Sequence, residues 1–244
     1  MVFEDFRYKC IEIFGRHTFL PTPTDEQIKK LYELTEIMLE VNKSMNLTAI
    51  TEENAIILRH YVDSISVSAE IPQCASVIDV GCGAGFPSLP LAIFRPDLTI
   101  TALDGTAKRI DYVNSTAKKL GITNVTAIAA RAEEYATKPE FRENFDVATA
   151  RAVAAMPILC ELCLPFVKVG GKFVAMKASQ GIKEAEQATN AARLCGGEMP
   201  VTKELALIAD NQELEQRVFI TVTKLEKTAQ KYPRHYSQIS KKPL

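Results

Sequence analysis

The chain from Val77 to Phe86 reads Val-Ile-Asp-Val-Gly-Cys-Gly-Ala-Gly-Phe, with an acid followed by three alternate glycines. The apolar residues before the glycines are typical of a buried parallel strand, and residues 89–94 after them favour a helix. A strand that turns sharply into a helix over glycines lets backbone approach a ligand closely, and the start of the helix offers free N–H donors. The segment therefore predicts a ligand site.

The spacing of the glycines narrows the class of ligand. A dinucleotide fingerprint needs its third glycine at position 86, where this chain has Phe86. Asp79 would repel a pyrophosphate, whereas it would attract the ammonium group of an amino acid. The pattern resembles that of class I S-adenosylmethionine methyltransferases, with a nucleotide site or a structural turn as alternatives. The candidate cofactor-binding residues are Asp79, Gly81, Gly83, Gly85 and Phe86.

Asp104 is a second candidate acid. It follows the strand expected at residues 98–103 and lies 23 positions after Gly81. An acid at about this distance can accept hydrogen bonds from both ribose hydroxyls of a nucleoside. The alternative is that Asp104 is the N-cap of a helix that starts near Thr106.

Composition excludes several classes of protein. The 244 residues are 47% hydrophobic and carry a net charge of −1, so they can bury a core but create no general basic field. We expect a cytoplasmic protein, because there is no signal-like start or long apolar run, and the six cysteines lack a disulfide framework. We expect no metal site: Cys160 and Cys163 form a Cys-x-x-Cys pair in an apolar run and no second ligand pair accompanies them.

The elements alternate along most of the chain. Residues 3–71 favour helices, and strands are expected at 76–80, 98–103, 124–129, 144–150 and 171–177. Helices are expected at 86–94, 106–120, 131–137, 155–167 and 181–195, and the runs 200–209 and 216–225 predict a hairpin.

This order predicts an α/β fold of the class I S-adenosylmethionine-dependent methyltransferase type. Such a fold has a Rossmann-like, mostly parallel seven-stranded sheet with an antiparallel C-terminal hairpin, here with an N-terminal helical cap. We expect three parts: residues 1–71 as a helical extension packed on the core, 72–230 as the cofactor-binding domain, and 231–244 as a basic tail.

The residues at the end of the fourth strand, Thr149 to Val153, limit the chemistry. They contain neither the Asp/Asn-Pro-Pro-Tyr/Phe motif of many amine methyltransferases nor a cysteine nucleophile. An acceptor with an available lone pair, such as guanine N7, needs neither and has only to be held in line. Oxygen or nitrogen of a small molecule remains an alternative.

Several longer stretches make the chain closely similar to the ribosomal small-subunit methyltransferase G family, also called GidB. They are Asn46–Ile50, Arg59–Ser64, Asp79–Ser88, Asp104 with Lys108-Arg109, Arg131–Glu133, Ala150–Ala154, Lys231–Arg234 and Lys241–Leu244. The family's tail pattern has a glycine and a proline between the last two stretches, whereas this chain has His235-Tyr-Ser-Gln-Ile-Ser240.

The resemblance implies N7 methylation of one guanine in the 530 loop of bacterial 16S rRNA, with S-adenosylmethionine as methyl donor. It implies cofactor contacts at Gly81 and Phe86, at Ala132 and Glu133 near the adenine, and at Arg151. Glu133 could instead compensate a helix dipole. Arg151, the candidate catalytic residue, could bind the cofactor carboxylate or an RNA phosphate, or form an ion pair with Asp146 or Glu161.

The partner is then 16S rRNA or the small ribosomal subunit, without DNA or membrane, and we expect a monomer. The basic residues of the tail, counted from Lys224 to Lys242, could hold phosphates or be merely solvated. We expect RNA contacts from Lys177, Lys231, Arg234, Lys241 and Lys242. His60 and Asp63, three positions apart, are expected to pair on one helix face.

Two other functions compete. One is a small-molecule methyltransferase of the same fold, which would need a closed pocket under the N-terminal helices. The other is a module that senses S-adenosylmethionine or binds RNA without turnover, because the acids and glycines suit binding as well as catalysis. A nicotinamide-dependent dehydrogenase is disfavoured by Phe86.

Overall fold

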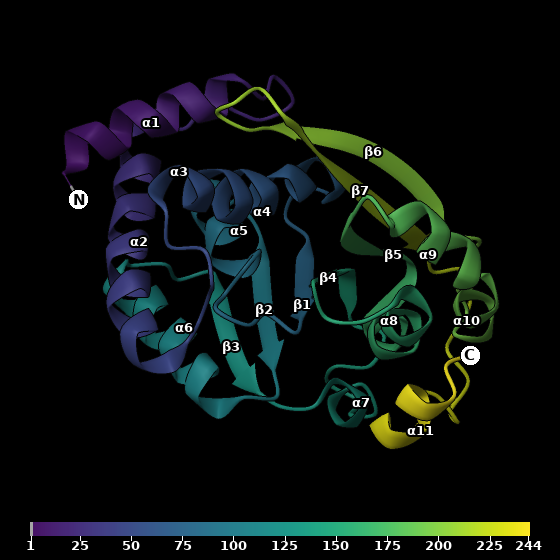
Figure 1. Ribbon diagram of the computed structural model, residues 1–244. Helices are drawn as coiled ribbons and strands as arrows, with labels where there is room; N and C mark the ends of the chain where they lie inside the picture. The colour runs from purple at the N-terminus through teal and green to yellow at the C-terminus, as the bar shows by residue number, and fades with distance from the viewer. Residues whose placement is uncertain (1) are drawn as a thin grey trace.

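The computed structural model describes residues 2–244 as three layers, in which helices cover both faces of one sheet (Figure 1). The sheet has the strand order β3-β2-β1-β4-β5-β7-β6. The strands are β1 (Ser76–Val80), β2 (Thr99–Asp104), β3 (Val125–Ala129), β4 (Phe145–Arg151), β5 (Val167–Ala178), β6 (Val201–Ile208) and β7 (Leu214–Thr223).

The first five strands are parallel, and β7 runs antiparallel to both β5 and β6. The predicted fold class is thereby confirmed, including the C-terminal hairpin. Strand order reverses between β1 and β4, where Asp79 lies level with Ala102 of β2 and Thr149 of β4. In open α/β sheets the crevice at such a reversal is where ligands bind.

Two long helices, α1 (Phe3–Gly15) and α2 (Asp25–Met45), begin the chain. Thr24 and Gln27 form a reciprocal capping box at the start of α2. The apolar stripe that follows at helical spacing is buried: Ile28, Leu31, Leu34, Thr35 and Met38.

The next segment changes helical type several times. It comprises α3 (Glu53–Ile56), the π-helical segment η1 (Ile57–Val62), α4 (Asp63–Ser66) and the 3-10 turn η2 (Val67–Glu70). π-Helical turns inside α-helices occur often at functional sites. This one carries Arg59 and His60, both of which line cavities described below.

Alternate strand residues point to opposite faces of the sheet and enter two hydrophobic cores. Val77 packs with the N-terminal helices, α5 (Ser88–Phe94) and α6 (Ala107–Lys119). Ile78 packs in the other core, which is formed by α7 (Ala132–Tyr135), α8 (Met156–Cys163), the turn η3 (Leu164–Phe166), α9 (Gly181–Gln187), α10 (Thr189–Leu194) and α11 (Tyr236–Lys241). Cys160 and Cys163 are fully buried there.

Some boundaries differ from those expected. The single helix expected at 181–195 is two helices, α9 and α10, which meet at Ala188 (φ −88°, ψ −6°). The fifth strand starts at Val167 rather than 171, since Val167 pairs with Phe145 of β4. None of the helices within residues 2–244 combines the length and apolar character needed to cross a bilayer.

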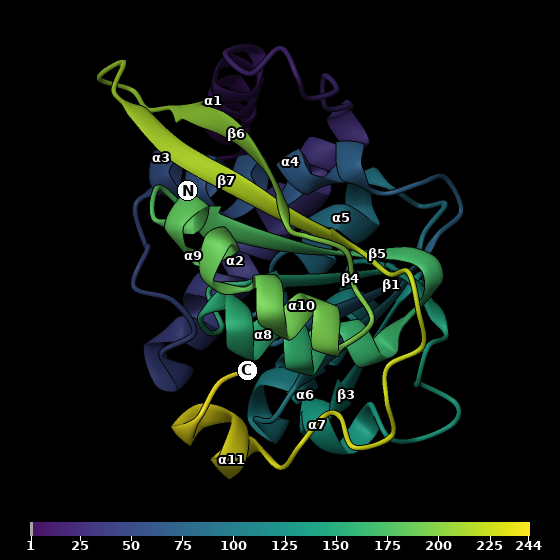
Figure 2. The ribbon, with the colours of Figure 1, turned by 90° about the vertical axis from the view of Figure 1, so that its right-hand side faces the viewer.

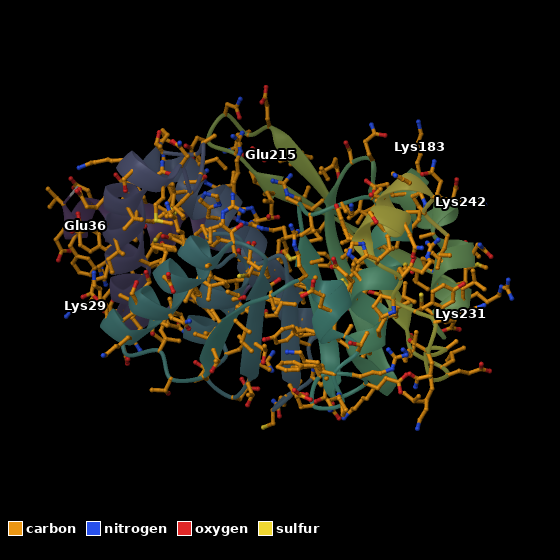
Figure 3. All side chains as sticks on the ribbon, turned by 90° about the horizontal axis from the view of Figure 1, so that it is seen from below. Lys29, Glu36, Lys183, Glu215, Lys231 and Lys242 are labelled. Atoms are coloured by element: carbon orange, nitrogen blue, oxygen red, sulfur yellow. The ribbon has the colours of Figure 1, made fainter. Side chains whose placement is uncertain are left out.

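Leu34→Ala tests whether the N-terminal helices share one core with the sheet. Leu34 is fully buried in the same cluster as Val77 and Leu89. We expect a loss of about 2–5 kcal/mol in the free energy of unfolding, from lost burial and a residual cavity. Urea unfolding followed by circular dichroism should show one cooperative transition at lower urea. Lys29→Ala, on the exposed side of α2 (Figure 3), is the control, and a separate early transition with the sheet unaffected would contradict the shared core.

Candidate functional site

The glycine turn after β1 is held against the end of β2. The N–H groups of Gly81 and Cys82 both donate to the carbonyl oxygen of Leu103, at 2.7 and 3.0 Å. Gly81 has φ +77°, and a Cβ atom there would lie 2.5 Å from Val153 Cγ2. Only glycine satisfies both the backbone angle and the close approach.

The last glycine of the turn has a different task. Gly85 has φ +84°, and a Cβ atom there would lie 2.7 Å from Leu89 Cδ1. Gly85 therefore lets α5 pack closely behind the turn, whereas Gly81, Gly83 and Phe86 lie in the wall of a cavity.

Asp79 lies beneath the turn rather than facing a ligand. Its side chain is buried, accepts hydrogen bonds from Ser88 Oγ at 2.5 Å and Thr149 Oγ1 at 3.2 Å, and is absent from the two cavity walls described next. Burial raises the pKa of this carboxyl to about 6. The structure thus gives Asp79 a supporting role in place of the expected contact with an ammonium group.

Asp104 faces the site directly. Its carboxylate accepts hydrogen bonds from the backbone N–H groups of Gly83, at 3.0 Å, and Thr106, at 2.8 Å. Thr106, and not Asp104, is the N-cap of α6. Asp104 also lines two adjoining cavities, so its remaining lone pairs can accept hydrogen bonds from a ligand in either.

The first cavity has a volume of about 270 Å³ and is lined by the ends of β1 and β2 and by the segment that follows β3. Ala132, Glu133, Val153, Leu162 and Tyr236 form part of its wall. Glu133 is only 8% exposed, and its carboxylate has no hydrogen-bond partner among residues 2–244. A buried free acceptor beside an apolar wall fits the exocyclic amino group and ring of an adenine.

The second cavity, of about 350 Å³, extends from the glycine turn to His60 and Arg151. The His60 ring stacks on Phe86 at 4.4 Å with an interplanar angle of 6°, and His60 Nε2 is 2.9 Å from Thr48 Oγ1. Burial, and then the nearby Arg151, lower the pKa of His60 to about 3, so the ring is neutral near pH 7.

Arg151 is oriented by a residue of the N-terminal helices. Its Nη1 donates to Asp63 Oδ2 at 2.8 Å and to the carbonyl oxygen of Arg59 at 3.0 Å, and its guanidinium lies 5.4 Å from the Phe86 ring centroid. Asp63 Oδ1 accepts a second bond, from Arg217 Nε at 2.9 Å.

These contacts correct two expectations. The partner of Arg151 is neither Asp146, which binds Lys168 and Ser76, nor Glu161, which binds Arg234. The expected pair between His60 and Asp63 is also wrong, because each side chain bonds to a different element.

A third cavity, of about 440 Å³, shares His60, Arg151 and Ala152 with the second. It adds the cationic side chains of Arg59, Lys177 and Arg217. The Lys177 ammonium donates to the carbonyl oxygen of Ala154 at 2.5 Å and pairs with Glu184 at 2.8 Å, so it already has partners within the protein.

The tail cations divide into two groups. Lys231, Lys241 and Lys242 are exposed, and Figure 3 shows Lys231 and Lys242 projecting outward on the C-terminal side. Arg234 instead binds Glu161, which is fully buried, at 2.6 Å. Lys224, which we counted with the basic tail, is also fully buried, with Nζ 2.6 Å from the carbonyl oxygen of Leu164.

Sequence reasoning missed parts of the site wall. Thr48, Arg217 and Tyr236 come from segments distant in the chain, and no local motif assigns them to a cavity. One signal was present: Arg217 lies in the first half of β7, the antiparallel strand next to β5, level with Ala178 at the carboxyl end of β5.

The sheet order, the glycine turn and the acids at the ends of adjacent strands define a class I S-adenosylmethionine-dependent methyltransferase. Solved structures share the fold: the [4+2]-cyclase SpnF has a TM-score of 0.55 at 14% identity, over 84% of this chain and 97% of SpnF. A protein of Methanosarcina mazei titled as a SAM-dependent methyltransferase has a TM-score of 0.50 at 15% identity, over 66% of this chain and 97% of its own.

The protein belongs to the GidB family, described as rRNA small subunit methyltransferase G, whose family model matches residues 27–213. A "Ribosomal RNA small subunit methyltransferase G" of Clostridium beijerinckii is 40% identical over the full length of both chains. The protein of that name from Exiguobacterium sp. is 43% identical, over 91% of this chain and 92% of its own. The resemblance inferred from the motifs is confirmed.

Gly81→Ala should disrupt the cavity walls without unfolding the sheet. The added methyl group must displace Val153, which lines both cavities, and a positive φ costs about 1–2 kcal/mol more. We expect isothermal calorimetry to show at least about ten-fold weaker binding of S-adenosylhomocysteine. Gly121→Ala, with φ +63° but open space around it, is the matched control. Unchanged affinity in Gly81→Ala would contradict the assignment of the turn to the ligand.

Asp79→Asn tests the buried carboxyl through the pH dependence of stability. Because its folded pKa is raised, the stability that Asp79 contributes is complete below about pH 3.8 and is lost as pH rises through about 6. The variant should therefore gain about 2 kcal/mol relative to the wild type between pH 4 and pH 8 in urea unfolding. Asp146→Asn is the control: the pKa of Asp146 is lowered to about 2, so its contribution changes little over this range. If the free energies of unfolding of Asp79→Asn and the wild type differ by the same amount from pH 4 to pH 8, the pKa of Asp79 is not raised.

Proposed function

We propose that this protein methylates N7 of one guanine in the 530 loop of bacterial 16S rRNA, with S-adenosylmethionine as methyl donor. The observation that carries the proposal is a second cavity whose titratable side chains are poorly suited to activate a nucleophile. Burial and Arg151 lower the pKa of His60 to about 3, which makes the ring a weak base, and burial raises the pKa of the Cys82 thiol well above its usual range. The Asp104 carboxylate already accepts hydrogen bonds from the Gly83 and Thr106 N–H groups. Guanine N7 already has an available lone pair, so it needs positioning but no general base.

The chain has suitable groups to hold the cofactor. Asp104 would accept the ribose hydroxyls, and Glu133 with Ala132 would face the adenine. The turn from Gly81 to Phe86 would lie against the amino-acid end, with Asp79 supporting it from below. When bound, S-adenosylmethionine supplies a methyl group activated by the positive charge of its sulfonium.

Arg151 would position the acceptor. Asp63 fixes the guanidinium above Phe86, where it can donate hydrogen bonds to a carbonyl oxygen of a base, a phosphate or the cofactor carboxylate. Arg151 is thus the side chain whose loss should affect transfer more than folding, because Asp63 would retain Arg217 as a partner.

The third cavity continues from the second and adds Arg59 and Arg217. Glu215 pairs with both guanidinium groups, at 2.7 and 2.9 Å, and Asp63 pairs with Arg217, so their remaining N–H donors are the ones that would bind a phosphate backbone. These donors support RNA over a small molecule as the substrate. Lys231, Lys241 and Lys242 are the tail residues free to reach phosphates, whereas Arg234 and Lys177 have internal partners. We expect a monomer that acts in the cytoplasm on 16S rRNA or the small subunit.

The test is methyl transfer from labelled S-adenosylmethionine to small ribosomal subunits and to naked 16S rRNA, both lacking the 530-loop methyl group. Mass spectrometry should locate one N7-methylguanine in that loop. Arg151→Ala should lower the rate about 100-fold, since misplacing a reactant by about 1 Å has this effect. Arg193→Ala, an exposed arginine on α10, should leave the rate unchanged.

The outcomes separate the candidate functions. Transfer to another nucleotide, or full activity of Arg151→Ala, would contradict the target or the role of Arg151. Binding of S-adenosylmethionine without transfer to either RNA form would favour the small-molecule or the sensing function.

A further inference from the structure

The first cavity has one wall from the C-terminal end of the chain. Tyr236, the first residue of α11, lines it together with Val153, Leu162 and Ala132. Figures 1 and 2 both show α11 on the side of the sheet that carries α7 and α8. Tyr236 lies in His235–Ser240, the segment in which this chain departs from the family's tail pattern.

The two ends of this segment meet at Arg234, which is anchored on one buried carboxylate. Arg234 donates from its backbone N–H, its Nε and its Nη2 to Glu161 of α8, at 2.6–2.9 Å. The same Nη2 donates to the carbonyl oxygen of Lys242 at 3.1 Å, which closes the segment into a loop. Glu161 is fully buried, so removing Arg234 would leave an unpaired buried charge, which makes this anchor costly to break.

The direction of the tyrosine follows from its neighbour on the helix. Ile239, three positions after Tyr236, is fully buried in the core with α8. Residues three apart share a helix face, so the anchor that buries Ile239 turns Tyr236 toward α8 and the cavity. Tyr236 as a residue nevertheless remains 39% exposed, which leaves surface available to a ligand.

A second tie connects the tail to the opposite wall. Arg142 donates to the carbonyl oxygen of Tyr232 in the tail and to those of Thr228 and Ala229 just before it, and also to that of Ala136 just after α7. Helix α7 carries Glu133, the free buried acceptor of the first cavity. The position of the tail is therefore coupled to both sides of the cavity.

We propose that Tyr236 is a cofactor-binding residue whose ring stacks on the adenine, and that residues 234–242 form a strap, anchored on Glu161, that holds it there. The proposal rests on the proposed function, because it takes the first cavity as the adenine site. An aromatic ring and a buried carboxylate recognise a purine by its face and its amino group, and stacking on an aromatic side chain is a recurrent way to hold a base.

The binding test uses S-adenosylhomocysteine and isothermal calorimetry on the full chain. Tyr236→Ala should weaken binding about ten-fold, while Tyr236→Phe, which keeps the ring, should stay within about two-fold of the wild type. Gln238→Ala, an exposed residue on the same helix, should bind normally. Wild-type affinity in Tyr236→Ala would overturn the proposal.

A spectroscopic test does not depend on affinity. The chain contains no tryptophan, so Tyr236→Trp introduces a single indole fluorophore. S-adenosylhomocysteine should quench its emission and protect it from acrylamide, whereas methionine, which lacks adenine, should do neither. Binding by calorimetry with unchanged emission would place the adenine elsewhere.

The two proposals can fail separately. If no RNA form is methylated but S-adenosylhomocysteine quenches the emission of the Tyr236→Trp variant and its binding depends on Tyr236, the rRNA function fails and the strap stands. If rRNA is methylated and Tyr236→Ala binds normally, only the strap fails. Failure of the wild type to bind S-adenosylhomocysteine at all would overturn both.

Discussion

The backbone hydrogen bonds between the glycine turn and the end of β2 set the position of everything else in the site. The N–H groups of Gly81 and Cys82 donate to the carbonyl oxygen of Leu103, and the Asp104 carboxylate accepts from the N–H of Gly83. The turn is therefore fixed to the end of β2 by both backbone and side-chain hydrogen bonds. Val153, just after β4, closes against Gly81. The ends of β2, β1 and β4 thus meet at the glycine turn. Strand order reverses between β1 and β4, and the first and second cavities both lie against the turn at this reversal.

Buried carboxylates then attach distant parts of the chain to this centre. Asp63 joins the N-terminal helices to β4 and β7 through Arg151 and Arg217, and Glu161 joins the tail to α8 through Arg234. Removing Arg234 would be costly, because Glu161 would stay buried without its ion-pair partner. The N-terminal helices are therefore part of the site as well as of the core, and the tail contributes a wall of the first cavity.

Most of the fold follows from local patterns. Short apolar runs, separated by segments with helical periodicity, predicted the five parallel strands and the hairpin. The capping box predicted the start of α2 correctly. The break at Ala188 and the π-helical segment η1 were not predictable, because the residues involved are ordinary helix formers. Packing of these helices against the sheet, rather than the helix propensity of their residues, decides where they break or change helical type.

For the site, the sequence by itself determined the glycine turn and Asp104, because glycine spacing and an acid at a strand end are local features. Only the tertiary structure decided which partner each charged residue takes. Spacing placed His60 beside Asp63, yet Asp63 binds arginines from two strands, and Asp79 supports the turn from below. A charged side chain pairs with the oppositely charged side chains that the strand order places next to it. The strand order in turn depends on contacts between residues far apart in the chain.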